Sequence, residues 1–278
     1  MNNILSKILC GVFIVFTISP GLSADAALRD TTLLANNISD IPSTAKITSV
    51  IAANVVYPLS LQNNIEESIE YVKNYSIKKR EYLIHTYQKG KKFFPKIAAI
   101  LKHNHLPQEL KILIALESGF NANAISPVGA VGYWQIMDDA AKEYGLHIAN
   151  EKETNPKLKD KDDRKNLSKS TIAAAKYLRD RCKNLNNDLL LMVASYNCGV
   201  GKVWQAMKKS GNPNADFWDI KKYLPTETRN YVMNFIALNV VFENYDKFLK
   251  NKMLFKPETV EKTYVSENAD KTISAETL

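Results

Sequence analysis

The amino-acid sequence predicts a mainly α-helical protein. Apolar residues recur at helical spacing along residues 65–106 and in four later segments, and this period is typical of helices that bury one face. Glycine, asparagine and proline separate the segments, as they do at helix ends. No segment shows the sustained alternation that predicts a half-buried strand, so a sheet is not needed. The later segments are residues 171–182, 188–197, 200–210 and 228–249.

The chain begins with the features of a secretory signal peptide. Lys7 precedes an apolar run over residues 8–18, and a Pro-Gly break and small residues follow it. The run is too short to cross a bilayer comfortably, so residues 1–24 are predicted to be removed on export. The mature chain is therefore expected in the periplasm, where it could associate peripherally with the cell envelope.

Periodicity divides the rest of the chain into four parts. Residues 25–61 carry scattered Asn, Ser, Thr and Pro without a steady period, which predicts a loosely ordered leader. Residues 62–105 are predicted to form a helical N-terminal extension of two or three helices. Residues 106–248 form the main helical domain, and the polar residues 249–278 are expected to form a tail.

The chain is basic, with a formal net charge of +8 that becomes +7 when Lys7 is removed. This excess indicates either a solvated basic surface or attraction to an anionic polymer such as cell wall or nucleic acid. No motif interleaves basic and aromatic residues as nucleic-acid-binding proteins do, so no nucleic-acid partner is predicted.

Neither the cysteines nor the histidines predict a bound group. Two cysteines remain after the signal peptide, Cys182 and Cys198. A pair of antiparallel helices would place them about 12 Å apart along the axis, so two free, mostly buried thiols are expected. The histidines form no convincing ligand set, so no metal and no cofactor are predicted. They are His85, His103, His105 and His147.

A single carboxylate interrupts the aliphatic residues near position 117. Leu110, Leu113 and Ile114 precede Glu117 by seven, four and three residues, which places its side chain on the apolar face of a helix. A buried carboxylate is costly unless it is paired or protonated, and burial raises its pKa. Glu117 is therefore either a paired structural acid or a catalyst. Gly119 is a natural helix end that would leave it at an open terminus.

Four segments occur in an order that resembles a known enzyme family. They are LESGFNANAISPVGAVGYWQIM, AAAKYLRD, SYNCGVGKVWQAM and LPTETRNYV. Together they resemble the Slt-type lytic transglycosylases, and most closely the membrane-bound lytic murein transglycosylase D branch. The resemblance covers about residues 62 to 245. It implies a lysozyme-like (goose-type/Slt) helical catalytic domain over residues 106–248, with the helical segment before it.

The resemblance also implies a reaction. Such enzymes cleave the β-1,4 bond between N-acetylmuramic acid and N-acetylglucosamine of peptidoglycan without adding water, and they leave a 1,6-anhydro ring. One carboxyl group, here Glu117, serves as acid and then as base. A lysozyme-like hydrolase is the enzymatic alternative, but it needs a second carboxylate, and none lies between Glu117 and Asp138. A non-catalytic cell-wall-binding protein of the same fold is the other alternative.

Three residues after Glu117 resemble family positions that line the sugar cleft. They are Ser126, Gln135 and Met137, of which the hydroxyl and the amide can hydrogen-bond sugar substituents. Without the resemblance, Ser126 with Pro127 would indicate a turn, and Met137 would indicate core packing.

Four residues further along the chain match the last two motifs. The resemblance implies that Tyr196 hydrogen-bonds or orients the catalytic acid, with Asn197 beside it. It makes Glu227 a cleft residue, which Tyr231 joins one turn later. Without it, Tyr196 and Asn197 would mark a helix end, and Glu227 would offset a helix dipole in the first turn.

Peptidoglycan glycan strands are thus the predicted partner, with envelope proteins as further candidates. Relatives commonly carry C-terminal wall-binding LysM modules, and none is recognised after residue 248. Affinity for the wall is then expected from the cleft, the basic surface or partner proteins.

Overall fold

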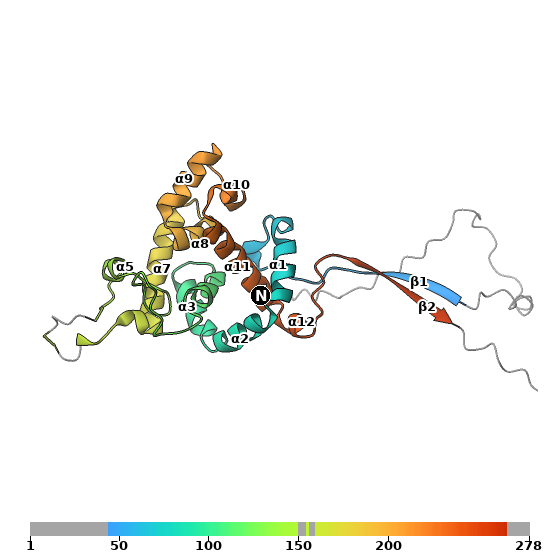
Figure 1. The fold of residues 1–278 in the computed structure, drawn as a ribbon, viewed down its shortest axis with the longest axis horizontal. Helices are drawn as coiled ribbons and strands as arrows, with labels where there is room; N and C mark the ends of the chain where they lie inside the picture. The colour runs from blue at the N-terminus through green and yellow to red at the C-terminus, as the bar shows by residue number, and fades with distance from the viewer. Residues whose placement is uncertain (1–43, 150–153, 156–158, 266–278) are drawn as a thin grey trace, which may run out of the picture. The chain divides into compact units, whose positions relative to one another are not determined.

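The computed structural model describes residues 44–149, 154–155 and 159–265. It divides into two compact units (Figure 1). One is Asn54–Phe255, and the described residues of the other are 44–53 and 256–265. The predicted signal peptide lies outside the described residues, as does most of the predicted leader.

The unit Asn54–Phe255 is built of helices and loops, which confirms the predicted mainly α-helical fold. The predicted helical extension forms α1, α2 and α3. Within the described ranges, no helix has both the length and the hydropathy required to cross a bilayer. The first elements are η1 (Leu59–Leu61), α1 (Glu66–Lys78), α2 (Arg80–Gly90), α3 (Phe94–His103), η2 (Gln108–Ile112) and α4 (Leu113–Ser118), where η denotes a 3-10 helix.

The second half of this unit follows a long loop after α4. Its last long helix, α11, is bounded by Pro225 on one side and Asn244 on the other. The elements are α5 (Asp138–Glu143), η3 (Asp163–Lys165), α7 (Leu167–Asn184), α8 (Leu189–Cys198), α9 (Val200–Ser210), α10 (Phe217–Ile220), η4 (Lys221–Tyr223), α11 (Thr226–Glu243) and α12 (Tyr245–Leu249).

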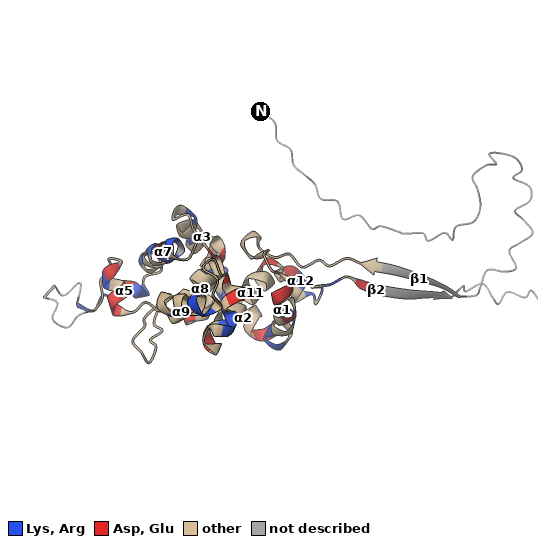
Figure 2. Cartoon of the chain, turned by 90° about the horizontal axis from the view of Figure 1, so that it is seen from above, with Lys and Arg blue, Asp and Glu red and all other residues tan. Residues whose placement is uncertain are grey.

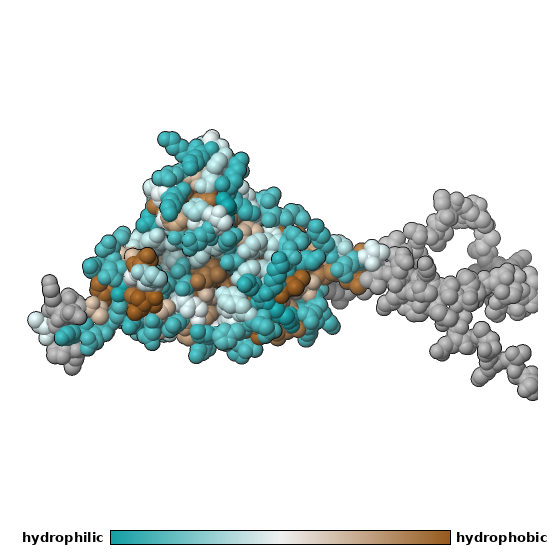
Figure 3. Space-filling view, viewed as in Figure 1, coloured by the Kyte–Doolittle hydropathy of each residue, from teal (hydrophilic) through white to brown (hydrophobic). Residues whose placement is uncertain are grey.

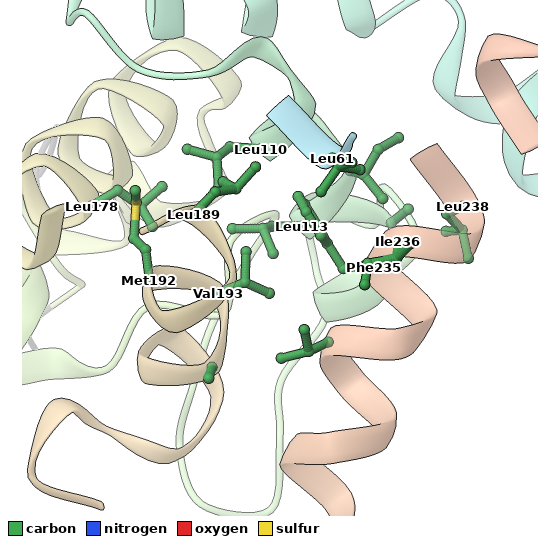
Figure 4. Packing of buried hydrophobic residues seen from close by; sticks show 14 of the residues in the cluster. Leu61, Leu110, Leu113, Leu178, Leu189, Met192, Val193, Phe235, Ile236 and Leu238 are labelled. Carbon is green, nitrogen blue, oxygen red and sulfur yellow. The ribbon is translucent and has the colours of Figure 1, made fainter. Parts of the chain in front are cut away.

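The hydrophobic core forms where α11 packs against α1, α4 and α8. Figure 4 shows Leu113 of α4, Val193 of α8 and Phe235 of α11 in one buried cluster, and each is fully buried. Truncating such a leucine to alanine usually costs about 2–5 kcal/mol. The short helix α4 is therefore held firmly by its neighbours, although it is only one and a half turns long.

Two strands form where the sequence analysis predicted none. β1 (Thr44–Ile51) pairs antiparallel with β2 (Glu258–Val265), with Thr44 opposite Val265 and Ile51 opposite Glu258. The prediction that residues 25–61 and 249–278 lack regular structure is wrong for these segments. Both contain the β-branched residues that favour strands, but each strand needs a partner at the other end of the chain, and periodicity within one segment cannot reveal it.

The predicted leader is also wrong at its C-terminal end. Tyr57 and Leu61 are buried in the core of the helical unit. The Val56 N–H donates to Asn244 Oδ1 (2.9 Å), and Asn244 Nδ2 donates to the Val56 carbonyl (2.6 Å). These contacts fix the segment through side chains too widely spaced to produce a helical period.

The basic residues are distributed rather than gathered. Lys and Arg occur on several helices, among them α2, α3 and α7, and Asp and Glu lie between them (Figure 2). The face of the helical unit seen in Figure 3 is mainly hydrophilic, with separate apolar patches. This distribution favours the interpretation of the basic excess as a solvated surface.

Candidate active site

Glu117 lies in the last turn of α4, on the face predicted from the sequence. Leu110, Leu113 and Ile114 are all fully buried, whereas Glu117 itself is half-buried and keeps some access to solvent. Gly119 ends the helix in the left-handed conformation, with φ of 54°, as predicted from its position. The carboxyl group therefore sits at the edge of the apolar core, at an open helix end.

Burial dominates the electrostatics of this carboxyl group. It raises the pKa of Glu117 from 4.5 to about 7, and a hydrogen bond from Tyr231 opposes the rise. Tyr231, on α11, donates its hydroxyl to Glu117 Oε1 at 2.5 Å. The pKa of Tyr231 is itself well above its usual value because of burial and the Glu117 charge, so its proton stays available for donation. At neutral pH both protonation states of Glu117 are accordingly populated.

Tyr196 was expected to hydrogen-bond or orient Glu117, but the hydrogen bond to Glu117 comes from another tyrosine. The Tyr196 hydroxyl donates to the Trp134 carbonyl at 2.7 Å, and Tyr231 holds the acid instead. Burial is the main cause of the raised Tyr196 pKa, and the Glu117 charge is the second. This electrostatic effect indicates that Tyr196 still lies near Glu117. The packing of α8 and α11 decides which tyrosine reaches the carboxyl group, and neither motif encodes that packing by itself.

The loop after α4 is held by hydrogen bonds within itself. Ser118 Oγ donates to the Tyr133 carbonyl (2.8 Å), which ties the two ends of the loop together. Ser126 closes a turn inside it: its N–H donates to the Ala130 carbonyl (2.9 Å), and its Oγ accepts from the Ala130 N–H (3.0 Å). The Ser126 hydroxyl therefore has a structural role in the turn, while its proton remains available to a ligand.

Gln135 and Met137 lie on the wall of a pocket. Gln135 has a left-handed backbone, with φ of 48°, and its Nε2 donates to the carbonyls of Ala124 (3.2 Å) and Gly132 (2.9 Å). Met137 is 45% exposed, so it is a surface contact rather than core packing. The pocket, of about 120 Å³, is lined by Gln135, Ile136, Met137, Ala140, Tyr144, Ala173, Ala174, Tyr177 and Tyr196.

The structure does not place every predicted site residue on this pocket. Asn197 Oδ1 accepts from Thr228 Oγ1 at 2.8 Å, which joins α8 to α11. Glu227 is exposed in the first turn of α11. Neither lines the pocket that contains Tyr196, and Glu117, Ser126 and Tyr231 do not line it either.

Cys198, the next residue after Asn197, is a free, half-buried thiol, as predicted. Burial raises its pKa, which keeps the thiol protonated. The side chain of Cys182 lies outside the described part of the chain. Among the described residues, no group of three His, Cys, Asp or Glu side chains is arranged to hold a metal ion.

One protein-family model matches part of the chain. The family model of the transglycosylase SLT domain matches residues 94–218. Residues 94–218 are thus similar to an SLT domain. The matched residues contain Glu117, Ser126, Gln135, Met137 and Tyr196, whereas Glu227 and Tyr231 follow the last of them.

Individual relatives also match parts of the chain. The membrane-bound lytic murein transglycosylase D of Escherichia coli K12 is 32% identical over 185 residues, which are 66% of this chain and 37% of that protein. A putative tributyltin chloride resistance protein of Alteromonas sp. strain M-1 is 31% identical over 120 residues, 42% of this chain and 54% of that protein. The chain thus spans about 37% of the length of the Escherichia coli relative.

Solved structures of lytic transglycosylases also align with part of the chain. An inactive mutant of lytic transglycosylase Slt from Pseudomonas aeruginosa aligns with a TM-score of 0.43 and 20% identity, over 58% of this chain and 25% of that one. The 70 kDa soluble lytic transglycosylase of Escherichia coli aligns with a TM-score of 0.41 and 23% identity, over 56% of this chain and 25% of that one.

Sequence reasoning missed two residues that stabilise the loop between α4 and α5. Trp134 is fully buried, and its Nε1 donates to Thr171 Oγ1 at 2.9 Å. Arg164 is 6% exposed and pairs with the carboxylates of Asp138 and Asp162. The Asp-Asp-Arg sequence at residues 162–164 was the available signal for a paired arginine, but its partner Asp138 could not be identified from spacing.

Proposed function

We propose that the chain is a peptidoglycan lytic transglycosylase, a lyase that acts in cell-wall remodelling. It cleaves the β-1,4 bond between N-acetylmuramic acid and N-acetylglucosamine without water and leaves 1,6-anhydromuramoyl ends. The observation that carries the proposal is a half-buried carboxyl group in an SLT domain, Glu117, with a pKa of about 7. The Escherichia coli relative is a lytic murein transglycosylase, which supports the same reaction.

Glu117 is assigned both proton transfers. In the first half-reaction, its protonated carboxyl group gives a proton to the glycosidic oxygen as the bond from that oxygen to the anomeric carbon breaks. In the second, its carboxylate removes the proton of the muramic 6-hydroxyl, whose oxygen attacks the anomeric carbon. Glu117 regains in the second half-reaction the proton that it gave in the first, so no water is consumed. An acid that must also act as a base works best with a pKa near the working pH, and the Glu117 pKa of about 7 meets this condition.

The surroundings of Glu117 favour a single-carboxylate mechanism over hydrolysis. A glycoside hydrolase uses a second carboxylate, and a nearby negative charge would raise the pKa of the first. Burial and the Tyr231 hydroxyl are instead the causes of the Glu117 pKa among the described residues. The alternative of a lysozyme-like hydrolase therefore gains no support.

The remaining predicted site residues are proposed to bind the glycan or to hold the site in place. Gln135 and Met137 contact the sugar from the pocket wall, which Tyr196 also lines, and the free proton of Ser126 is offered to a sugar oxygen. Asn197 keeps α8 in place through Thr228. Glu227 binds or orients substrate from the start of α11, beyond the pocket.

We propose export to the periplasm, with peptidoglycan strands as the main partner. The signal-peptide pattern of residues 1–24 supports this location, and the Escherichia coli relative is described as membrane-bound. Envelope proteins are proposed as further partners.

Mass spectrometry of fragments released from purified peptidoglycan tests the reaction. The proposal predicts muramic ends one water lighter than reducing ends. Glu117→Gln should remain folded and lose activity by about 100-fold or more, because it cannot transfer a proton. Reducing ends would identify a hydrolase. Binding of glycan without release of any fragment by the unaltered protein would identify a non-catalytic protein.

A further inference from the structure

The wall of the pocket has no regular secondary structure to hold it in place. Gln135, Ile136 and Met137 line the pocket, and they lie between α4 and α5 in a loop that contains only isolated bridges. The Ile136 N–H donates to the Val131 carbonyl (3.1 Å), and the Val131 N–H donates to the Ile136 carbonyl (3.2 Å). The backbone bonds of the loop close turns within it, and contacts from another segment help such a loop present its side chains accurately.

Arg164, which does not line the pocket, supplies that support. Its Nη1 donates to the Ile136 carbonyl (3.3 Å) and to an Asp138 carboxylate oxygen. Its Nε and Nη2 donate to the Asp162 carboxylate (3.0 Å and 2.8 Å). One guanidinium thus joins the residues on either side of Met137 to the segment that begins η3.

The backbone of the same residue touches the loop at a second point. A Cβ atom on Gly132 would lie 2.2 Å from the Arg164 carbonyl oxygen, and Gly132 has φ of 80°. Only glycine allows this approach. Arg164 therefore contacts the loop at two points. Its main chain lies against Gly132, and its guanidinium binds Ile136 and Asp138.

The chemistry of the guanidinium suits this task. Arg164 and Asp162 each have side chains 7% exposed, whereas that of Asp138 is 57% exposed. A buried cation must be paired, and the planar guanidinium fixes direction as well as charge, which the single ammonium of lysine does not. Arg164 does not line the pocket, so it acts through the loop and not on a ligand directly.

We propose that Arg164 is a positioning residue for glycan binding. It holds the Ile136 carbonyl and Asp138 so that Gln135 and Met137 face the pocket. This inference rests on the proposed function for the identity of the ligand. Glu117 is held separately, by α4 and Tyr231, so loss of the guanidinium weakens glycan affinity and leaves the ionisation of Glu117 unchanged.

The test measures binding apart from catalysis. The probe is a soluble tetrasaccharide of alternating N-acetylglucosamine and N-acetylmuramic acid, titrated by calorimetry into Glu117→Gln protein. Adding Arg164→Lys should weaken binding by roughly 10-fold, since misplaced contacts are costly, and adding Asp138→Asn should weaken it by about 3-fold, as for an exposed pair. The exposed neighbour provides the matched control, Lys165→Gln, which should stay within about 2-fold.

Kinetics of the active protein provide the readout that a merely structural role would not give. Arg164→Lys should raise KM by a factor similar to its effect on binding, with the pH dependence of kcat/KM unchanged. Circular dichroism establishes that each variant is folded at the assay temperature. If Arg164→Lys does not fold, Asp138→Asn decides the question, because its side chain is largely exposed.

The possible failures can be told apart. If the unaltered protein binds glycan but releases no anhydro fragments, the proposed function fails, and the binding comparison still decides the role of Arg164. Unchanged affinity in the folded variants, or failure of the Glu117→Gln protein to bind the tetrasaccharide at all, overturns the inference. A shift of the pH profile at constant KM overturns it as well.

Discussion

Glu117→Gln should stabilise the folded protein in a pH-dependent way while it abolishes activity. The pKa of Glu117 is raised from 4.5 to about 7 by burial, so the folded state binds a proton that the unfolded state releases between these values. Stability that depends on this proton is fully present below pH 4.5 and is lost as pH rises towards 7. Glutamine carries no charge at any pH and should avoid the loss.

The magnitude follows from the width of this pH window. Each pKa unit corresponds to about 1.4 kcal/mol, so the rise to about 7 corresponds to roughly 3 kcal/mol. Glu117 is only half-buried, and solvent screening reduces the figure to about 2 kcal/mol. The Gln variant should therefore exceed the unaltered protein in stability by about 2 kcal/mol at pH 8 and by little at pH 4.

Urea denaturation at both pH values measures the difference. Glu243→Gln serves as the control, because Glu243 is an exposed glutamate on the helix that carries Tyr231. Its effect should stay within about 0.5 kcal/mol at either pH. A stability gap for Glu117→Gln that is equal at pH 4 and pH 8 would refute the account of Glu117 as a buried, readily protonated acid, even if the variant is inactive.

Three further substitutions test other parts of the site. Tyr231→Phe removes the donor that lowers the Glu117 pKa, so the decline of kcat/KM at alkaline pH should move upwards by about one unit or more; an unmoved decline would contradict this. Gly132→Ala should cost about 3 kcal/mol or more in thermal or urea unfolding, because its Cβ would meet the Arg164 carbonyl at positive φ; a stable variant would show that the loop can shift. Met137→Ala should raise KM several-fold with a stability change below about 1 kcal/mol, because the side chain is 45% exposed; a large loss of stability would indicate core packing instead.

The part of the site encoded by local spacing could be predicted from the sequence. Three aliphatic residues at helical intervals placed Glu117 on an apolar face, and Gly119 marked the helix end. Both features depend on about two turns of helix, so no knowledge of the rest of the fold was needed. The raised pKa followed from the same pattern.

The contacts between distant segments could not be predicted in this way. Tyr196 and Tyr231 lie on different helices, and only the packing of α8 with α11 determines that Tyr231 reaches Glu117. The pairing of β1 with β2 joins the two ends of the chain. Arg164 pairs with Asp138, 26 residues earlier in the chain, and its carbonyl lies against Gly132. In each case the informative quantity is a distance in space, for which sequence separation is no guide.

Burial and the Tyr231 hydrogen bond shift the Glu117 pKa in opposite directions. Because they come from different helices, a change in either one can adjust this pKa. Burial along α4 favours the protonated form that the first half-reaction needs, and the Tyr231 hydroxyl from α11 favours the carboxylate that the second needs. Burial alone would raise the pKa further and leave too little carboxylate at neutral pH, whereas a solvent-exposed glutamate near 4.3 would hold too little acid. The position of α11 against α4 therefore sets the balance between the two half-reactions, so packing changes at this interface should alter the pH dependence of activity without touching the pocket.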